Sequence, residues 1–283
     1  MPDPTPHPTP HPTPHRTSRP TPASRRPDDR QHRLRFHRPE NALRRLGATP
    51  DTALAALFGT DAGDYRDRLA AFEEHNRTAA AELEARPGAA ARIAGLPFRP
   101  GQHLVAVGES TTADRFSWFE ILRHLLPDGV RCTNLAVPGS TTTQALADLP
   151  LLAFQRPDWV LCMLGANDAQ RLDGVPLVTA AETRRNLTAL RDLTVRRTGA
   201  RWIWLTPSSV DPARTDSYEH FRRAGLSWSA ADIDATADFL HAQREPAVDT
   251  RPATRTHQEP DGLHLTPAGQ RAVTEALLAA LHP

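Results

Sequence analysis

The chain has 283 residues, of which 39% are hydrophobic and 24% charged, and its formal net charge is +1. This length allows one large domain, or one domain with an appendage, and the composition is typical of a protein with a packed core. No apolar run approaches the roughly 20 residues that a membrane-spanning helix needs, and two cysteines cannot form a disulfide scaffold. A net charge near zero gives no overall electrostatic reason to expect nucleic-acid binding.

The N-terminal segment differs in composition from the rest of the chain. Residues 4–15 read PTPHPTPHPTPH, and residues 16–38 hold more arginine than acidic residues. Proline disfavours helix, and so polar a segment buries too little apolar surface to fold, so we expect residues 1–38 to be disordered. Metal binding by the histidines, or nucleic-acid binding by the arginines, is less favoured than a solvated low-complexity tail. No apolar stretch typical of a secretion signal follows Met1, which favours a cytoplasmic protein.

Residues 39–98 are predicted to form a small helical extension. Thr49-Pro50 gives a helix cap followed by proline at the first helical position, ahead of the sequence DTALAALF. Apolar residues recur at helical spacing from about 61 to 86, and Arg86-Pro87-Gly88 ends that pattern. No chemistry is indicated in this region.

From residue 99 to 283 the pattern is that of a single α/β domain. Short apolar strands alternate with helical stretches, which predicts a parallel sheet flanked by helices, with ligands at the carboxyl edge of the strands. Cys132 and Cys162 fall inside predicted strands, where a small buried side chain is the expected role. We expect strands at 102–107, 130–137, 158–164, 201–206 and 247–249, and helices at about 110–126, 179–197, 230–244 and 266–281.

Four short polar segments lie at that carboxyl edge. They are Gly108-Glu109-Ser110 after the first strand, Pro138-Gly139-Ser140 after the second, Asn167-Asp168 after the third, and Asp261-Gly262-Leu263-His264 before the last helix. Taken singly, each has an ordinary structural explanation as a cap, a turn or a surface polar residue. Their order along the chain and their position after strands make them specific as a set.

Together these segments supply the groups that acyl transfer requires. Ser110, at a strand-to-helix turn, is the candidate nucleophile, and His264 is the candidate base. Asp261 lies three residues before His264 and is suited to hold its imidazole in one tautomer. The backbone N–H groups of Ser110 and Gly139 and the side-chain amide of Asn167 are the candidate oxyanion hole.

These four segments resemble the signature blocks of the SGNH hydrolases, also called GDSL esterases/lipases. Ser110, Gly139, Asn167 and His264 match the residues that name the family, and Asp261 matches its Asp-x-x-His partner. The resemblance covers roughly residues 100–283. It implies a flavodoxin-like three-layer α/β/α sandwich with a central parallel sheet of about five strands. It also implies ester hydrolysis through an acyl-serine, with no metal or other cofactor.

One residue departs from the family pattern, because Glu109 stands where the first block usually has aspartate. The extra methylene could shift Ser110, and a misplacement of about 1 Å can cost on the order of 10²-fold in rate. The leading hypothesis is a serine esterase acting on a small-molecule ester with a small or medium acyl group, such as O-acetyl on a sugar or metabolite. The alternative is an attenuated pseudo-hydrolase that acts as a ligand-binding module. Residues 207–228 are expected to be a long irregular loop at the active edge, and nothing indicates an oligomeric state.

Overall fold

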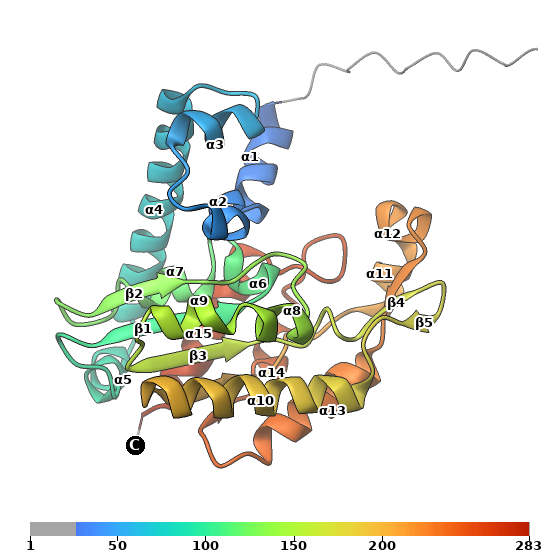
Figure 1. Ribbon diagram of the computed structural model, residues 1–283. Helices are drawn as coiled ribbons and strands as arrows, with labels where there is room; N and C mark the ends of the chain where they lie inside the picture. The colour runs from blue at the N-terminus through green and yellow to red at the C-terminus, as the bar shows by residue number, and fades with distance from the viewer. Residues whose placement is uncertain (1–26, 283) are drawn as a thin grey trace, which may run out of the picture.

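A five-stranded parallel sheet forms the centre of the computed structural model, which describes residues 27–282 (Figure 1). The strand order is β2-β1-β3-β6-β8, and every neighbouring pair is parallel. This confirms the predicted flavodoxin-like sheet. The strands are β1 (His103–Gly108), β2 (Arg131–Asn134), β3 (Trp159–Met163), β6 (Arg201–Leu205) and β8 (Ala247–Val248).

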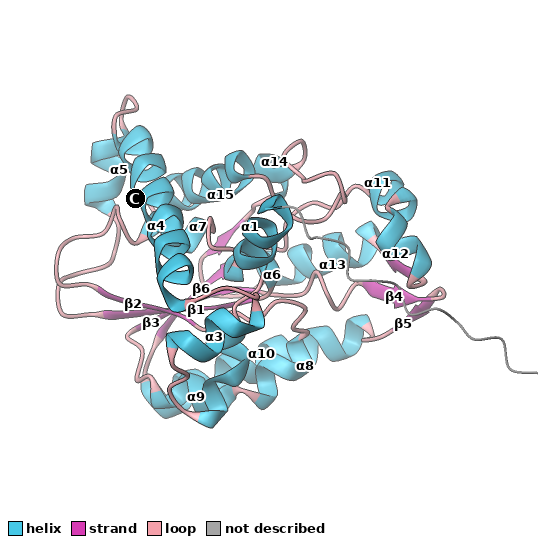
Figure 2. Ribbon diagram, turned by 90° about the horizontal axis from the view of Figure 1, so that it is seen from above, coloured by secondary structure: helices cyan, strands magenta, loops and turns pink. Residues whose placement is uncertain are grey.

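Helices cover both faces of this sheet and make the three layers (Figure 2). Alternate residues of β1 pack on opposite faces of the sheet. Leu104 and Ala106 belong to one apolar core, and Val105 and Val107 belong to the other. All five residues of β3 are buried, as expected for a central parallel strand. The first face carries α7 (Trp118–Leu122) and α15 (Pro267–Ala280), and the second carries α8 (Thr142–Ala147), α9 (Leu149–Phe154), α10 (Ala180–Thr198) and α13 (Ala230–His241).

The helical extension has a small core of its own and also joins the main core. Leu54, Phe58, Tyr65 and Phe72 pack together within the extension. Leu83, near the end of α4, instead packs in the same core as the sheet. The elements of the extension are α1 (Pro27–Phe36), α2 (Pro39–Ala42), the 3-10 turn η1 (Leu43–Leu46), α3 (Asp51–Leu57), α4 (Ala62–Glu84) and α5 (Ala89–Gly95).

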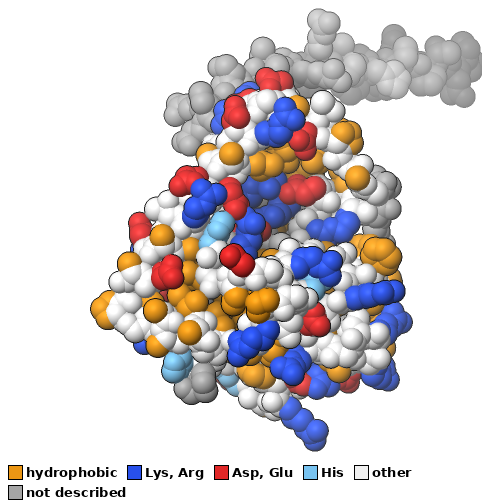
Figure 3. Space-filling model, turned by 90° about the vertical axis from the view of Figure 1, so that its left-hand side faces the viewer, with side chains coloured by type: hydrophobic (Ala, Val, Ile, Leu, Met, Phe, Trp, Pro, Cys, Tyr) orange, Lys and Arg blue, Asp and Glu red, His pale blue; other side chains and the backbone are white. Residues whose placement is uncertain are grey.

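Ion pairs also connect α4 to the helices of the α/β domain. Arg271 of α15 pairs with Glu82 at 2.5 Å, and Arg123, just after α7, pairs with Glu73. Figure 3 shows the side of the molecule on which α4 and α5 lie, and acidic and basic side chains are interspersed over much of it. The extension is thus attached by apolar packing and by charge along the same helix.

The expectation that residues 1–38 are disordered is wrong for their last part, because α1 is a helix that packs on the domain. Leu34 and Phe36 are buried, and the guanidinium of Arg35 is paired rather than solvated. Tertiary contacts therefore stabilise a segment whose composition does not favour structure. Residues 1–26, including the Pro-His repeat, lie outside the described residues.

Several connections differ from the sequence expectation. The single helix expected at 110–126 is two short helices, α6 (Ser110–Ala113) and α7, and the second strand ends at Asn134. Residues 207–228 are not irregular, because they form α11 (Pro212–Ser217), α12 (Glu219–Arg223) and β7 (Leu226–Trp228). Strand β7 pairs with β4 (Gln170–Leu172), which also pairs with β5 (Val175–Pro176) in a second, antiparallel sheet. Among the described residues, no helix combines the length and apolarity that crossing a membrane requires.

Candidate active site

Ser110 lies where β1 turns into α6, as its sequence context predicts. It is the first residue of α6 and 9% exposed, and Glu109 before it has extended backbone. Gly108 is required at the end of β1, because a Cβ there would lie 2.4 Å from Oγ1 of Thr112. As a first helical residue, Ser110 has no intrahelical acceptor for its N–H, which leaves this donor available for negative charge.

Glu109 connects the end of β1 to the end of β3. Its buried carboxylate accepts the backbone N–H groups of Ala166 and Asn167 at 3.2 and 3.1 Å, and the Asn167 side-chain amide at 2.8 Å. Burial raises the pKa of Glu109 to about 8, although these N–H donors favour the charged form and act in the opposite direction. The longer side chain thus reaches the third block directly.

Asn167 and Asp168 also hold the loop that follows β2. The Asn167 amide donates to the Ser140 carbonyl at 3.1 Å, next to Gly139, whose φ of +77° is in the region that favours glycine. Asp168 accepts the backbone N–H of Thr142, at the start of α8, at 2.9 Å. The first three blocks are therefore joined by direct hydrogen bonds, and the two hydrogens of the Asn167 amide have Glu109 and Ser140 as acceptors.

Asp261 and His264 form a hydrogen-bonded pair in the loop before α15. The Asp261 carboxylate lies 2.6 Å from Nδ1 of His264 and also accepts the backbone N–H groups of Leu263 and His264. Burial alone would raise the pKa of Asp261, but the His264 ring and these N–H groups hold it below its usual value. Asp261 is therefore held ionised, as required to orient an imidazole and stabilise its protonated form.

Helix α11 supports this loop from one side. Gly262 has a φ of +74°, and a Cβ there would lie 2.6 Å from Cβ of Arg214 and 2.8 Å from the Asp211 carbonyl. Asp211 donates its backbone N–H to the Gly262 carbonyl at 2.8 Å, and the Arg214 guanidinium donates to the Glu259 carbonyl. The segment after β6 thus packs against the Asp–His loop.

The fourth block is connected to the first through the N-terminal extension. Among the described residues, no hydrogen bond joins the Ser110 hydroxyl to the His264 imidazole. Arg35 of α1 instead contacts Asp114, just after α6, and the carbonyl of Leu265, next to His264. Arg35 is not predictable as a site residue from the sequence, because an arginine in a basic run gives no signal of its distant partners.

A family model for the GDSL-like lipase/acylhydrolase family matches residues 106–272, more than half of the chain. The chain belongs to this family. The match includes all five candidate residues: Ser110, Gly139, Asn167, Asp261 and His264. A search of curated proteins finds no match.

Solved structures of other proteins share the fold of this GDSL-like acylhydrolase. TesA is 26% identical, with a TM-score of 0.50 over 64% of this chain and 99% of its own. A lipase/acylhydrolase from Enterococcus faecalis is 23% identical, with a TM-score of 0.50 over 63% of this chain and 94% of its own. Est24, a carbohydrate acetylesterase from Sinorhizobium meliloti, is 15% identical, with a TM-score of 0.53 over 63% of this chain and 97% of its own.

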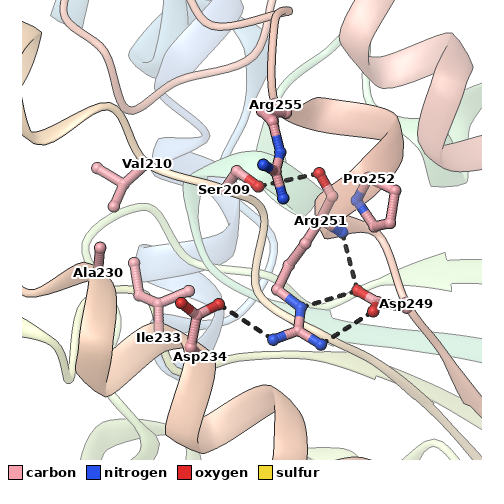
Figure 4. Close-up of a pocket in the computed structure, with 9 residues that line it drawn as sticks. All are labelled: Ser209, Val210, Ala230, Ile233, Asp234, Asp249, Arg251, Pro252 and Arg255. Atoms are coloured by element: carbon pink, nitrogen blue, oxygen red, sulfur yellow. Dashed lines mark hydrogen bonds and ion pairs between the residues drawn. The ribbon is translucent and has the colours of Figure 1, made fainter.

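A separate cavity of about 490 Å³ lies near the ends of β6 and β8 (Figure 4). Arg251 projects into it, but its guanidinium donates to Asp249 at 2.9 Å and to Asp234 at 3.0 Å, so its charge is already neutralised. None of the candidate catalytic residues lines this cavity. Within residues 27–282, no three His, Cys, Asp or Glu side chains come together as a metal site.

The raised pKa of Glu109 predicts a specific pH dependence of stability. Because the folded-state pKa lies above the ordinary value of 4.5, folding favours the neutral form, and this contribution is lost as the pH rises from 4.5 through about 8. Relative to Glu109→Gln, the free energy of unfolding of the wild type should fall by up to about 1.4 kcal/mol per pH unit in this window. Urea unfolding from pH 5 to 9 measures this, and parallel curves for the two proteins would show that Glu109 does not titrate there.

Proposed function

We propose that this GDSL-like acylhydrolase is a serine esterase with Ser110 as nucleophile, His264 as base and Asp261 as the orienting carboxylate. The observation that carries the proposal is the Asp261–His264 contact of 2.6 Å, in a loop tied to the segment that bears Ser110. The Ser110 hydroxyl attacks the ester carbonyl and passes its proton to Nε2 of His264. Collapse of the tetrahedral intermediate expels the alcohol, which takes that proton, and water then hydrolyses the acyl-serine by the same route.

The oxyanion that forms on the carbonyl oxygen needs hydrogen-bond donors. Gly139 lies outside helices and strands, and its N–H donates to no other described residue, as expected for one donor of this hole. The Ser110 N–H at the start of α6 is a second. The Asn167 amide would serve as a third by exchanging the Ser140 carbonyl for the oxyanion, while its bond to Glu109 keeps it in place.

The second candidate function is ligand binding without turnover. The observation in its favour is that Glu109 replaces the usual aspartate and accepts the Asn167 amide, a group that the esterase needs as an oxyanion donor. An organophosphonate probe separates the two functions, because only an activated serine is phosphonylated. Covalent labelling at Ser110 supports the esterase, and a folded protein that stays unlabelled supports the binding module.

The proposed substrate is an ester with a small or medium acyl group, such as an O-acetyl group on a sugar or metabolite. The carbohydrate acetylesterase among the similar structures agrees with the small end of this range. An apolar cavity of about 410 Å³ supports the medium range: α2, α3 and the Val137-Pro138 segment line it. That segment directly precedes Gly139. His37 also lines the cavity, and its pKa is lowered mainly by burial and to a smaller degree by neighbours that include Arg33 and His264.

Removal of the nucleophile or the base should abolish esterase activity. Ser110→Ala and His264→Ala are each expected to lower kcat for p-nitrophenyl acetate by about 10⁴–10⁶-fold. Ser217→Ala and His241→Ala are matched controls on exposed helical positions and should keep wild-type rates. Wild-type turnover in either catalytic variant would rule out the proposed mechanism.

Removal of the Asn167 amide tests its role as an oxyanion donor. Asn167→Ala should lower kcat by roughly 10²–10³-fold, because the transition state loses one hydrogen bond. The measurement is steady-state kinetics alongside urea unfolding, which separates lost stability from lost rate. An unchanged kcat would restrict the amide to its bonds with Glu109 and Ser140.

Filling the apolar cavity tests its role as an acyl site. Ala42, an exposed residue of α2, lines the cavity, and Ala42→Phe should obstruct it. We expect kcat/KM for p-nitrophenyl hexanoate to fall about 10- to 100-fold, while acetate hydrolysis is retained. The reason is that each methylene that can no longer be buried loses about 0.8 kcal/mol of binding free energy. Ala90→Phe, on the exposed side of α5, is the control. Equal effects on both esters would place the acyl group elsewhere.

A further inference from the structure

Two contacts link the nucleophile turn to the region of the Asp–His loop. Gln270 of α15 donates its side-chain amide to the Thr111 carbonyl at 2.9 Å, and the link that reaches the loop itself comes from α1. Arg35, in its last turn, is only 9% exposed, and its Nε and Nη2 donate to the Asp114 carboxylate at 2.9–3.1 Å. Asp114 is fully buried and directly follows α6, and its backbone N–H donates to the Ser110 carbonyl at 2.8 Å. Asp114 thus connects the guanidinium to the proposed nucleophile, because it bonds to Arg35 with its side chain and to Ser110 with its backbone.

The remaining donor hydrogens of the same guanidinium contact the Asp–His loop on both sides of the proposed base. Nη1 of Arg35 donates to the Glu259 carboxylate at 2.6 Å, and Nη2 donates to the Leu265 carbonyl at 2.6 Å. The backbone N–H of Glu259 in turn donates to the His264 carbonyl at 2.6 Å. These two contacts connect both ends of the 259–265 segment to one planar group.

The residue after Arg35 covers the imidazole itself. The ring of Phe36 lies 5.0 Å from that of His264, tilted by 54°, and the Arg35 guanidinium lies 4.4 Å from the same phenyl ring. This packing leaves the imidazole less room to rotate. Position and ring orientation of His264 therefore both depend on consecutive residues of α1.

We propose that Arg35 is a positioning residue of the esterase, which sets the separation of Ser110 and His264 by holding their two segments on one guanidinium. The proposal rests on the serine-esterase function argued above. Asp261 and His264 lie in a loop outside regular helix and strand, so contacts from outside the loop must place them within the fractions of an ångström that proton transfer demands. Helix α11 supports the loop, and Arg35 is the contact that also reaches the segment of Ser110. Arginine suits this role because its rigid fork presents five donors, whereas lysine presents a single flexible ammonium.

Two variants loosen the tie without leaving a buried carboxylate unpaired. Glu259→Gln removes the charge of one acceptor and keeps the Arg35–Asp114 ion pair. Arg35→Lys keeps a cation beside Asp114 and loses the fork. Glu40→Gln is the matched control, because Glu40 also pairs with a buried arginine, Arg115 at 3.0 Å, and its side-chain exposure of 31% is close to the 22% of Glu259.

The readouts are kinetics and hydrogen exchange on the full chain. Glu259→Gln and Arg35→Lys should lower kcat for p-nitrophenyl acetate about 10- to 100-fold with KM unchanged, and Glu40→Gln should leave kcat as it is. The backbone N–H groups of Leu263 and His264, which donate to Asp261, should exchange at least about tenfold faster in the two loosened variants alone.

Each outcome then has one meaning. Unchanged exchange and kcat in Glu259→Gln overturn the positioning role, even if Arg35→Lys fails to fold. An equal loss of kcat in Glu40→Gln also overturns it, because general docking of the extension would then be the cause. Faster exchange in a protein whose wild type neither turns over esters nor reacts with a phosphonate supports the tie and overturns the esterase function instead.

Discussion

The candidate site depends on one buried carboxylate at the carboxyl edge of the sheet. Glu109 follows β1, and it accepts three N–H groups from Ala166 and Asn167, which follow β3. Two adjacent parallel strands thereby end in one hydrogen-bonded unit, and Asn167 extends it to the Ser140 carbonyl. A carboxylate without a cation partner is costly to bury, and the donors around Glu109 offset part of that cost. Burial of the Glu109 carboxylate therefore lowers the stability of the fold, and its hydrogen bonds hold Asn167 in position.

The sheet and the four polar blocks are predictable from sequence because their signals are local. Continuous apolar runs identify central strands such as β3, and right-handed crossovers bring the carboxyl ends of such strands to one edge. The blocks at Ser110 and Asn167 then follow from their positions after strands. The identity of Asp261 and His264 as a pair follows from their spacing, and the structure places them in contact.

The contribution of α1 is not predictable in this way. Its residues are polar and basic, and composition alone indicates a solvated segment. The helix forms because Leu34 is buried in the extension and Arg35 pairs with Asp114, which lies 79 residues further along the chain. Contacts at such separation leave no periodicity in the sequence. The same holds for the antiparallel sheet that contains β4 and β7, whose short strands have too few residues to show alternation.

The extension and the α/β domain share interactions at several places, two of which argue against a boundary near residue 98 that separates independent units. At one end of the extension, Leu83 and Phe98 pack in the core that contains the sheet residue Leu104. At the other end, Arg35 connects segments that begin and finish the α/β domain. Because the proposed nucleophile and base come from those two segments, the distance between them is a property of both regions together. The helical extension is best regarded as part of the candidate active site rather than as an appendage to it.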